Sequence, residues 1–171
     1  MSDCKRLSRE FYTRDVLKVA PALLSKILVI AKPDGTFSRF LVTETEAYRG
    51  SEDLACHACR GRTPRTEVMF HNGGLIYVYL VYGIHWMLNV VTGTVNEPQA
   101  VLIRSIEGYT GPGRLTRILG IDGSFYGEDL ISSKRIWFED STSEPVIKAG
   151  ERIGIDYAGD YWRRKPWRFY F

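Results

Sequence analysis

The spacing of apolar and polar positions predicts a chain made mainly of β-strands. Apolar runs rich in β-branched and aromatic residues, bounded by turn residues, are typical of strands. Such runs occur at 26–32, 37–48, 75–83, 85–93 and 99–107, and weaker ones at 143–159 and 165–171. Pro-Asp-Gly-Thr separates the first two runs and Gly83 lies between the next two, so each pair is expected to form an antiparallel hairpin.

Two short helices are expected beside these strands. Between 16 and 20 the apolar residues have helical spacing, Thr13 is placed to cap that helix, and Pro21 should kink or restart it. The segment 111–120 has a proline near its start and a glycine at its end, as helices often do. Strands and a few short helices together predict the α+β class, with a mainly antiparallel sheet.

The length and the connections indicate how the chain is organised. Its 171 residues suggest one domain that can bury a substantial core. The polar stretch 49–74 is long for a connection in a compact domain, and stretches of this length are usually functional or disordered.

Two glutamates interrupt the strand predicted at 37–48. Strict alternation would place Phe40, Val42, Glu44, Glu46 and Tyr48 on one face of that strand. Because unpaired charges are rarely buried, these glutamates either meet solvent or arginines at a sheet edge, or one of them is a general base in a cleft beside the tyrosine. The pattern alone does not choose between the two carboxylates.

Tyrosines are concentrated in the run at 75–83. Tyr77 and Tyr79 fall on one face, where they fit either a packed core or a binding pocket. Tyr82 falls on the other face beside Gly83 and should point outward, where an aromatic ring can act as a wedge between stacked bases.

The long polar stretch carries a group of cations and hydroxyls. Arg60, Arg62, Thr63 and Arg65 suit phosphate contacts, because arginine forks match phosphate geometry and hydroxyls add donors; a solvated loop is the equal alternative. The Cys-His-Ala-Cys sequence at 56–59 lacks the second Cys-x-x-Cys pair of a structural zinc site, so its cysteines are expected to be small buried side chains.

Composition adds only mild constraints. With 23 basic and 20 acidic residues, the formal charge of +3 permits a nucleic-acid partner without requiring one. No apolar run approaches the roughly 20 residues of a membrane span. Three cysteines and a polar N-terminal sequence suggest an intracellular protein, cytoplasmic or in the nucleoid.

Several motifs, taken together and in order, resemble the alkyladenine (3-methyladenine) DNA glycosylase family. They are Glu-Thr-Glu-Ala-Tyr from position 44, Arg-Thr-Pro-Arg from 62, Tyr-Val-Tyr-x-x-Tyr-Gly from 77 and Arg-Lys-Pro-Trp-Arg-Phe-Tyr from 164. The resemblance implies a single domain, 1–171, with a curved antiparallel sheet and surrounding helices. It implies hydrolysis of the N-glycosidic bond of alkylated or deaminated purines in duplex DNA by a monomer that uses no metal or other cofactor.

The resemblance also assigns roles in the chemistry. Glu46 matches the catalytic glutamate, and Arg104 matches an arginine that helps to hold the attacking water. No lysine in the motif matches a Schiff-base nucleophile, so the implied product is an abasic site in an uncut strand. The segment between Arg104 and the Gly-Pro-Gly motif is shorter here than in many related sequences.

The remaining matches concern the base. Tyr48 and Tyr79 match residues that stack on the extruded base, with His57 beside it. Asn89 matches the residue against the purine edge, and Tyr82 matches the residue that fills the gap left in the duplex.

Two other functions remain open at this point. A non-catalytic module could bind damaged or single-stranded DNA through its tyrosines and arginines. A metal-dependent nuclease could use Glu44, Glu46 and Asp53 as ligands, in which case EDTA would abolish activity.

Overall fold

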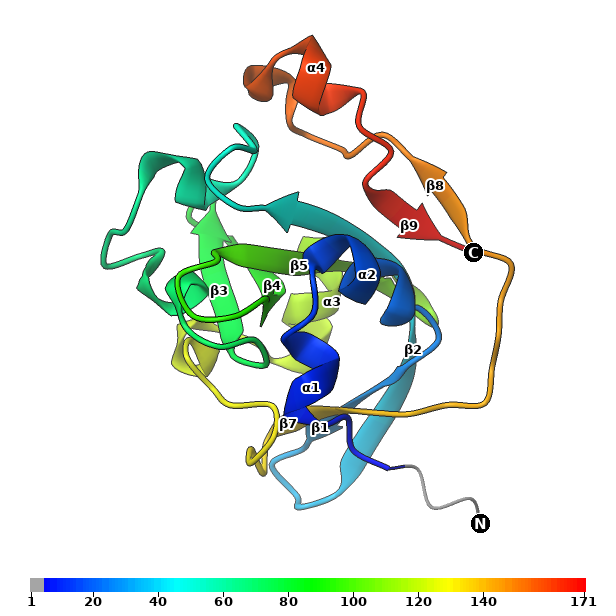
Figure 1. The fold of residues 1–171 in the computed structure, drawn as a ribbon. Helices are drawn as coiled ribbons and strands as arrows, with labels where there is room; N and C mark the ends of the chain where they lie inside the picture. Colours follow the sequence, from blue (N-terminus) through cyan, green and yellow to red (C-terminus); the bar gives the residue numbers. More distant parts are fainter. Residues whose placement is uncertain (1–4) are drawn as a thin grey trace.

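The computed structural model describes residues 5–171, and its centre is an antiparallel sheet of nine strands (Figure 1). The main strand order is β3-β4-β5-β2-β1-β7, with β6 on β5 and with β8 and β9 beside β2. The strands are β1 (Ile27–Ala31), β2 (Phe37–Arg49), β3 (Ile76–Val81), β4 (His85–Thr92), β5 (Gln99–Ile106), β6 (Tyr109–Thr110), β7 (Ile136–Glu139), β8 (Lys148–Gly150) and β9 (Arg168–Tyr170).

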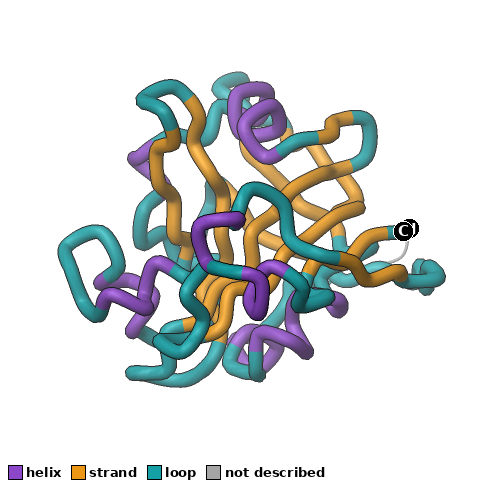
Figure 2. The backbone as a smooth tube through the Cα atoms, turned by 90° about the horizontal axis from the view of Figure 1, so that it is seen from above, coloured by secondary structure: helices purple, strands orange, loops and turns teal. Residues whose placement is uncertain are grey.

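Short helices surround this sheet (Figure 2). They are α1 (Arg9–Tyr12), α2 (Val16–Ala22), α3 (Pro112–Leu119) and α4 (Asp160–Arg163), with 3-10 turns at His57–Arg60, Glu67–Phe70, Gly123–Phe125 and Asp156–Ala158. Val19 of α2, Leu115 of α3 and Ile103 of β5 are fully buried in one apolar cluster. The expected α+β class, with a mainly antiparallel sheet, is confirmed.

The long strand β2 has different partners along its length. Its first part pairs with β1, and residues 44–46 pair with β9 instead. The opposite edge pairs with β5. Figure 1 shows the consequence: the segment carrying β8, α4 and β9 lies beside the second half of β2, where the functional motifs occur.

An irregularity in β2 changes which residues share a face. The register with β5 shifts between Val42 and Thr45. Val42 and Ala47 both belong to the main apolar cluster, although residues five apart would lie on opposite faces of a regular strand. The expectation that Val42 shares a face with Glu46 is therefore wrong.

The predicted hairpins and helix ends agree only in part with the structure. Both hairpins formed as predicted, and α3 ends at Gly120 in the left-handed conformation, with φ +66°. Asp15, not Thr13, caps α2, because its carboxylate accepts a hydrogen bond from the Leu17 amide at 2.9 Å. Pro21 lies within the last turn of α2.

Two other segments differ from the prediction. The strand β7 was not expected, and only three residues of the segment 143–159 form a strand. The stretch 49–74 contains two 3-10 turns that bury side chains such as Val68 and Met69.

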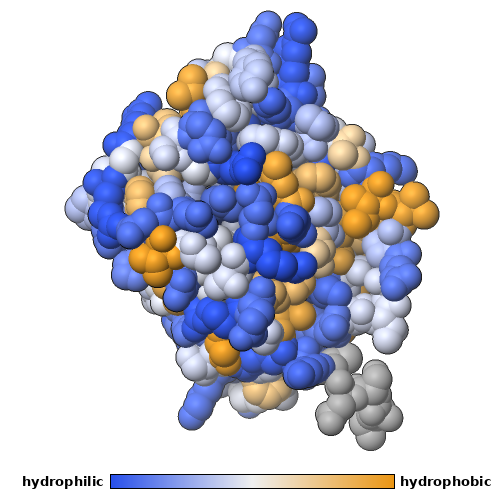
Figure 3. Space-filling model, in the orientation of Figure 1, coloured by the Kyte–Doolittle hydropathy of each residue, from blue (hydrophilic) through white to orange (hydrophobic). Residues whose placement is uncertain are grey.

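The surface seen in Figure 3 is mainly hydrophilic, with apolar residues in separate small groups. Among residues 5–171, no helix has the length and hydrophobicity needed to span a membrane.

Candidate active site

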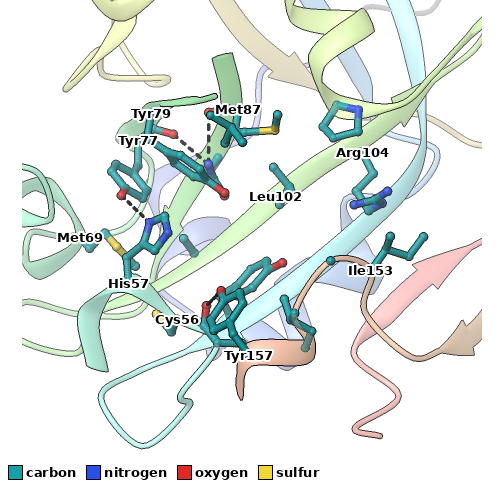
Figure 4. Close-up of a pocket in the computed structure, with 18 of the residues that line it drawn as sticks. Cys56, His57, Met69, Tyr77, Tyr79, Met87, Leu102, Arg104, Ile153 and Tyr157 are labelled. Atoms are coloured by element: carbon teal, nitrogen blue, oxygen red, sulfur yellow. Dashed lines mark hydrogen bonds between the residues drawn. The ribbon is translucent and has the colours of Figure 1, made fainter. Parts of the chain in front are cut away.

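A pocket of about 240 Å³ lies where β2, β3, β4 and β5 meet the 49–74 stretch and the segment after β8. Figure 4 shows side chains converging on it from all of these elements. Its lining includes Tyr48, Cys56, His57, Met69, Tyr77, Tyr79, Tyr82, Met87, Asn89, Leu102, Arg104, Ile153 and Tyr157. Aromatic walls with a few polar groups are typical of sites that bind a flat organic ring.

Glu46 lies directly behind this lining and is fully buried. The Tyr48 hydroxyl donates a hydrogen bond to its Oε2 at 2.8 Å, and the Ile153 amide donates to its Oε1 at 2.7 Å. Arg104 Nη1 lies 3.4 Å from the same Oε1. These contacts fix the orientation of the carboxylate, and Oε2, with a single donor, keeps capacity for a further one.

Burial raises the pKa of Glu46 above its ordinary value. The Arg104 charge, the Ile153 amide and the Tyr48 hydroxyl oppose the effect of burial without cancelling it. A raised pKa makes the carboxylate a stronger base than an exposed glutamate, as general-base catalysis requires.

Glu44, two residues earlier, has a different environment. Its Oε2 accepts a hydrogen bond from Ser105 at 2.7 Å, and its Oε1 lies 3.0 Å from Arg168 Nη1 and 3.3 Å from Arg104 Nε. Burial raises the pKa of Glu44, but the Ser105 and Arg168 hydrogen bonds and the two arginine charges outweigh it, so the pKa is lowered overall. Glu44 is thus held as a carboxylate partner for cations.

His57 and two tyrosines form one aromatic wall. His57 Nδ1 and the Tyr77 hydroxyl are 2.8 Å apart, and the His57 and Tyr79 ring centroids are 4.5 Å apart in an edge-on arrangement. Burial, reinforced by the charges of Arg65 and Arg60, lowers the pKa of His57 to about 4. The imidazole is therefore neutral at pH 7 and does not repel a positively charged ring.

Asn89 contributes a fixed polar group to the pocket. Its Nδ2 donates hydrogen bonds to the carbonyl oxygens of Tyr77 and Met87, both at 3.2 Å. These bonds use both amide protons, so the carbonyl oxygen is the polar atom that Asn89 can present to a ligand. The side chain is buried and lines the pocket, which fits a residue that shapes one edge of the site.

Tyr82 lies at the rim, in the turn between β3 and β4. It is 90% exposed and has a φ of +52°, followed by Gly83 at +69°. Positive φ at both positions is typical of primed hairpin turns, but it is unfavourable for a bulky residue such as tyrosine. The expected outward orientation of this ring is confirmed.

The cations of the 49–74 stretch have different surroundings. Arg62 pairs with Glu67 at 2.8 Å and lies over the Phe70 ring. Arg65 lies over the Tyr79 ring, 5.0 Å from its centroid, and so connects the rim with the pocket wall. Arg60 is exposed and has no ion pair within residues 5–171. Thr63 Oγ1 is 3.0 Å from Thr66 Oγ1, so the two hydroxyls form a hydrogen bond to each other within the loop.

The segment after β8 supplies residues that the sequence did not suggest. Ile153 and Tyr157 line the pocket, and Arg152 forms a buried ion pair with Asp53 at 2.6 Å. The sequence of 143–159 predicted only a weak strand and not these contacts, because they depend on how the segment packs against β2.

The metal-site alternatives gain no support from the geometry. Asp53 forms an ion pair with Arg152, and no group of three or more His, Cys, Asp or Glu side chains within residues 5–171 is arranged to hold a metal ion. Cys56 is buried as expected, and burial raises the pKa of its thiol to about 12. Cys59 is only partly buried.

Comparison with known proteins gives a consistent result. The family model described as "Methylpurine-DNA glycosylase (MPG)" matches residues 10–110 and 107–171. A protein of Desulfitobacterium hafniense is 45% identical over 97% of this chain and 95% of its own length. A protein of Psychrobacter cryohalolentis is 42% identical over 88% of this chain and 84% of its own length. A protein of Natranaerobius thermophilus is 40% identical over 96% of this chain and 94% of its own length. Each of the three carries the name "Putative 3-methyladenine DNA glycosylase".

Proposed function

Because the chain belongs to the methylpurine-DNA glycosylase family and is a DNA glycosylase of base excision repair, we propose that it acts on alkylated and deaminated purines in duplex DNA. Its substrates are 3-methyladenine, 7-methylguanine and hypoxanthine. It flips the damaged nucleotide out of the helix and hydrolyses the N-glycosidic bond. The observation that supports this most strongly is a buried, oriented carboxylate, that of Glu46, behind an aromatic pocket.

Base flipping provides access to the bond. A base stacked in a duplex cannot be attacked at its sugar carbon by a water that the enzyme holds, and flipping costs a few kcal/mol. Tyr82, exposed at the rim, inserts into the vacated stack and offsets part of that cost. Arg60, Arg62, Thr63 and Arg65 contact the neighbouring phosphates.

The pocket binds the flipped base through its aromatic rings. Tyr48 and Tyr79 stack on the purine, with His57 beside it. Alkylated adenines carry positive charge, so the rings attract them by cation–π interaction in addition to stacking. Because burial lowers the pKa of His57 to about 4, its neutral ring adds no repulsion toward such a base.

Glu46 performs the hydrolytic step. Ionised, it takes a proton from a water that Arg104 helps to hold, and its negative charge stabilises the oxocarbenium-like sugar. The raised pKa of Glu46 favours proton transfer from that water. No lysine of the described residues 5–171 lines the pocket, so the expected products are a free base and an abasic site in an intact strand.

One assay separates hydrolysis from metal-dependent strand cleavage. A labelled duplex with a single hypoxanthine is incubated with the enzyme in EDTA, and half of the sample is then heated in alkali, which breaks DNA at abasic sites. We expect a strand break at the lesion only in the alkali-treated half. A break without alkali, or loss of activity in EDTA, would contradict the proposal.

A further inference from the structure

Arg152 and Asp53 form an ion pair without exposed side-chain surface. Arg152 Nη1 is 2.6 Å from Asp53 Oδ2, and Nη2 is 3.0 Å from Oδ1, so the guanidinium binds the carboxylate through two parallel contacts. A buried pair of this kind is costly to desolvate, and apolar side chains often replace one without loss of stability. Stability alone is therefore a weak reason for its presence.

The guanidinium connects three segments of the chain beside the pocket. Nη1 also donates to the carbonyl oxygen of Ala47, the residue between Glu46 and Tyr48, at 3.0 Å. Nη2 donates to the Trp162 carbonyl oxygen at the end of α4, at 3.3 Å. Arg152 thus holds the strand that carries both the carboxylate and the stacking tyrosine.

Aromatic rings lie near the guanidinium as well. Its central carbon is 4.9 Å from the centroid of Tyr48 and 5.0 Å from that of Trp167. Tyr48 therefore has Arg152 as a support, and it lines the pocket that receives the base. A cation in contact with that ring limits how far it can move.

Asp53 extends the same network into the pocket wall. Its carboxylate also accepts hydrogen bonds from the amides of Arg49 and Ala55, both at 3.0 Å. Ala55 begins the wall that continues through Cys56 to His57. Residues on two sides of the base site are thus attached to one ion pair.

The chain neighbour of Arg152 contacts the carboxylate of Glu46 directly. Ile153 donates its amide to Glu46 Oε1 at 2.7 Å. Because the Arg152 side chain fixes its own backbone against β2, it also fixes the position of that amide.

We propose that Arg152, held by Asp53, is a positioning residue that sets the placement of Glu46 relative to Tyr48. This inference rests on the roles proposed above for those two residues. Arginine suits the task, since its planar fork can bind a carboxylate and a carbonyl while a ring lies against it. Lysine keeps the charge but lacks both the fork and the planar surface.

The experiment compares four variants in single-turnover excision of hypoxanthine with enzyme in excess. Arg152→Gln removes the pair, Asp53→Asn with Arg152→Gln removes both charges, and Arg152→Lys keeps the cation. Arg39→Gln is the matched control, because Arg39 pairs with the buried Glu139 at the opposite end of β2. With enzyme in saturating excess, the rate constant reports the folded enzyme, and a separate titration with substrate in excess gives the active fraction of each variant.

The rate constant should fall about 100-fold in Arg152→Gln and in the double variant, the loss typical of a misplaced catalytic group. Arg152→Lys should lose less, and Arg39→Gln should keep the normal rate constant. Binding of undamaged duplex should be unchanged in all four variants, because the rim is not altered.

A pH profile of the rate constant gives a second readout that a purely structural role would not move. The titratable or charged groups around Glu46 are Tyr48, Tyr79, Arg104 and Arg152, with Glu44 and Arg168 adjacent. The Arg152 charge holds down the pKa of Glu46, so the acidic limb should move to higher pH in Arg152→Gln and in the double variant. It should stay in place in Arg152→Lys.

A normal rate constant in the double variant would overturn the inference, and so would an acidic limb that does not move. Failure of both Gln-containing variants to fold would also overturn it, since the pair would then be needed for the fold itself. Glu46→Gln, measured alongside, keeps the two proposals distinct: full activity in that variant contradicts the proposed function, not only the role of Arg152.

Discussion

Glu44 and Glu46 occupy one strand, two residues apart, yet the structure gives them opposite environments. Around Glu44, Ser105, Arg104 and Arg168 supply hydrogen bonds and positive charge, and the pKa is lowered. Around Glu46, burial is the largest effect and the pKa is raised. Similar carboxylates thus become a cation partner and a candidate base through surroundings that other strands supply.

The difference shows what the β8–β9 segment contributes. Its β9 strand brings Arg168 to Glu44, whereas the loop after β8 brings the Ile153 amide to Glu46. Glu44 lies close to two arginines, whereas Glu46 accepts hydrogen bonds from two neutral donors and has Arg104 at 3.4 Å. A base needs the second arrangement, because a strongly paired carboxylate is a weak proton acceptor.

Replacing Glu46 should have a much larger effect on catalysis than replacing Glu44. Glu46→Gln should slow excision by roughly 100- to 10,000-fold, because an amide cannot take a proton from water. Glu44→Gln should cost much less. The measurement is the single-turnover rate on a hypoxanthine duplex, with lesion binding as the control for folding. Near-normal excision by Glu46→Gln would contradict the assignment.

Replacing Tyr82 tests base flipping at the rim of the pocket separately from the hydrolytic step at Glu46. Tyr82→Ser should slow excision from paired duplex by roughly 10- to 100-fold, since flipping costs a few kcal/mol and the wedge offsets part of it. Excision of a lesion that is already unpaired should change far less. Equal losses on the paired and unpaired substrates would show that Tyr82 is not a wedge.

A smaller effect concerns selectivity, which stacking cannot provide because every purine has a π-face. Guanine differs from hypoxanthine by its 2-amino group, and a side chain packed against that edge excludes guanine. Asn89→Ala and Asn89→Ser should therefore raise the ratio of guanine to hypoxanthine excision by roughly 10-fold. Single-turnover rates on matched duplexes give this ratio, and no rise in either variant would contradict the gating role.

The smallest effect concerns the exposed cations. Replacing Arg60 or Arg65 with Gln should reduce the slope of log affinity against log salt by about 1. Arg62→Gln is the internal comparison and should change the slope less, because Glu67 already neutralises part of that charge. Titration of undamaged duplex at several salt concentrations measures the slopes. Unchanged slopes throughout would show that this loop does not contact DNA.

The sequence predicted those parts of the fold that depend on local pattern. The hairpins around Gly35 and Gly83 follow from apolar runs and turn residues, and both are present. The strand β7 is only four residues long and was missed, because its burial comes from pairing with β1. Alternation failed at Val42, where the register irregularity moves that side chain to the core.

Residues of the candidate active site could be predicted from the sequence only where they belong to a family motif. Glu46, Tyr48 and Tyr79 came from the family resemblance, and the structure brings them together around one pocket. Arg152 and Asp53 are 99 residues apart and contact one another only after the C-terminal segment has packed on β2. No local spacing encodes such a contact.

We infer that the surroundings of the two glutamates, rather than their positions in the strand, give them different pKa values. NMR titration of enzyme with ¹³C-labelled glutamate carboxyl groups tests it directly, with Glu46→Gln and Glu44→Gln assigning the signals. The signal lost in Glu46→Gln should titrate above the pKa of an ordinary exposed glutamate, and the signal lost in Glu44→Gln should titrate below it. Equal pKa values for the two groups, or the reverse order, would show that their surroundings do not separate them.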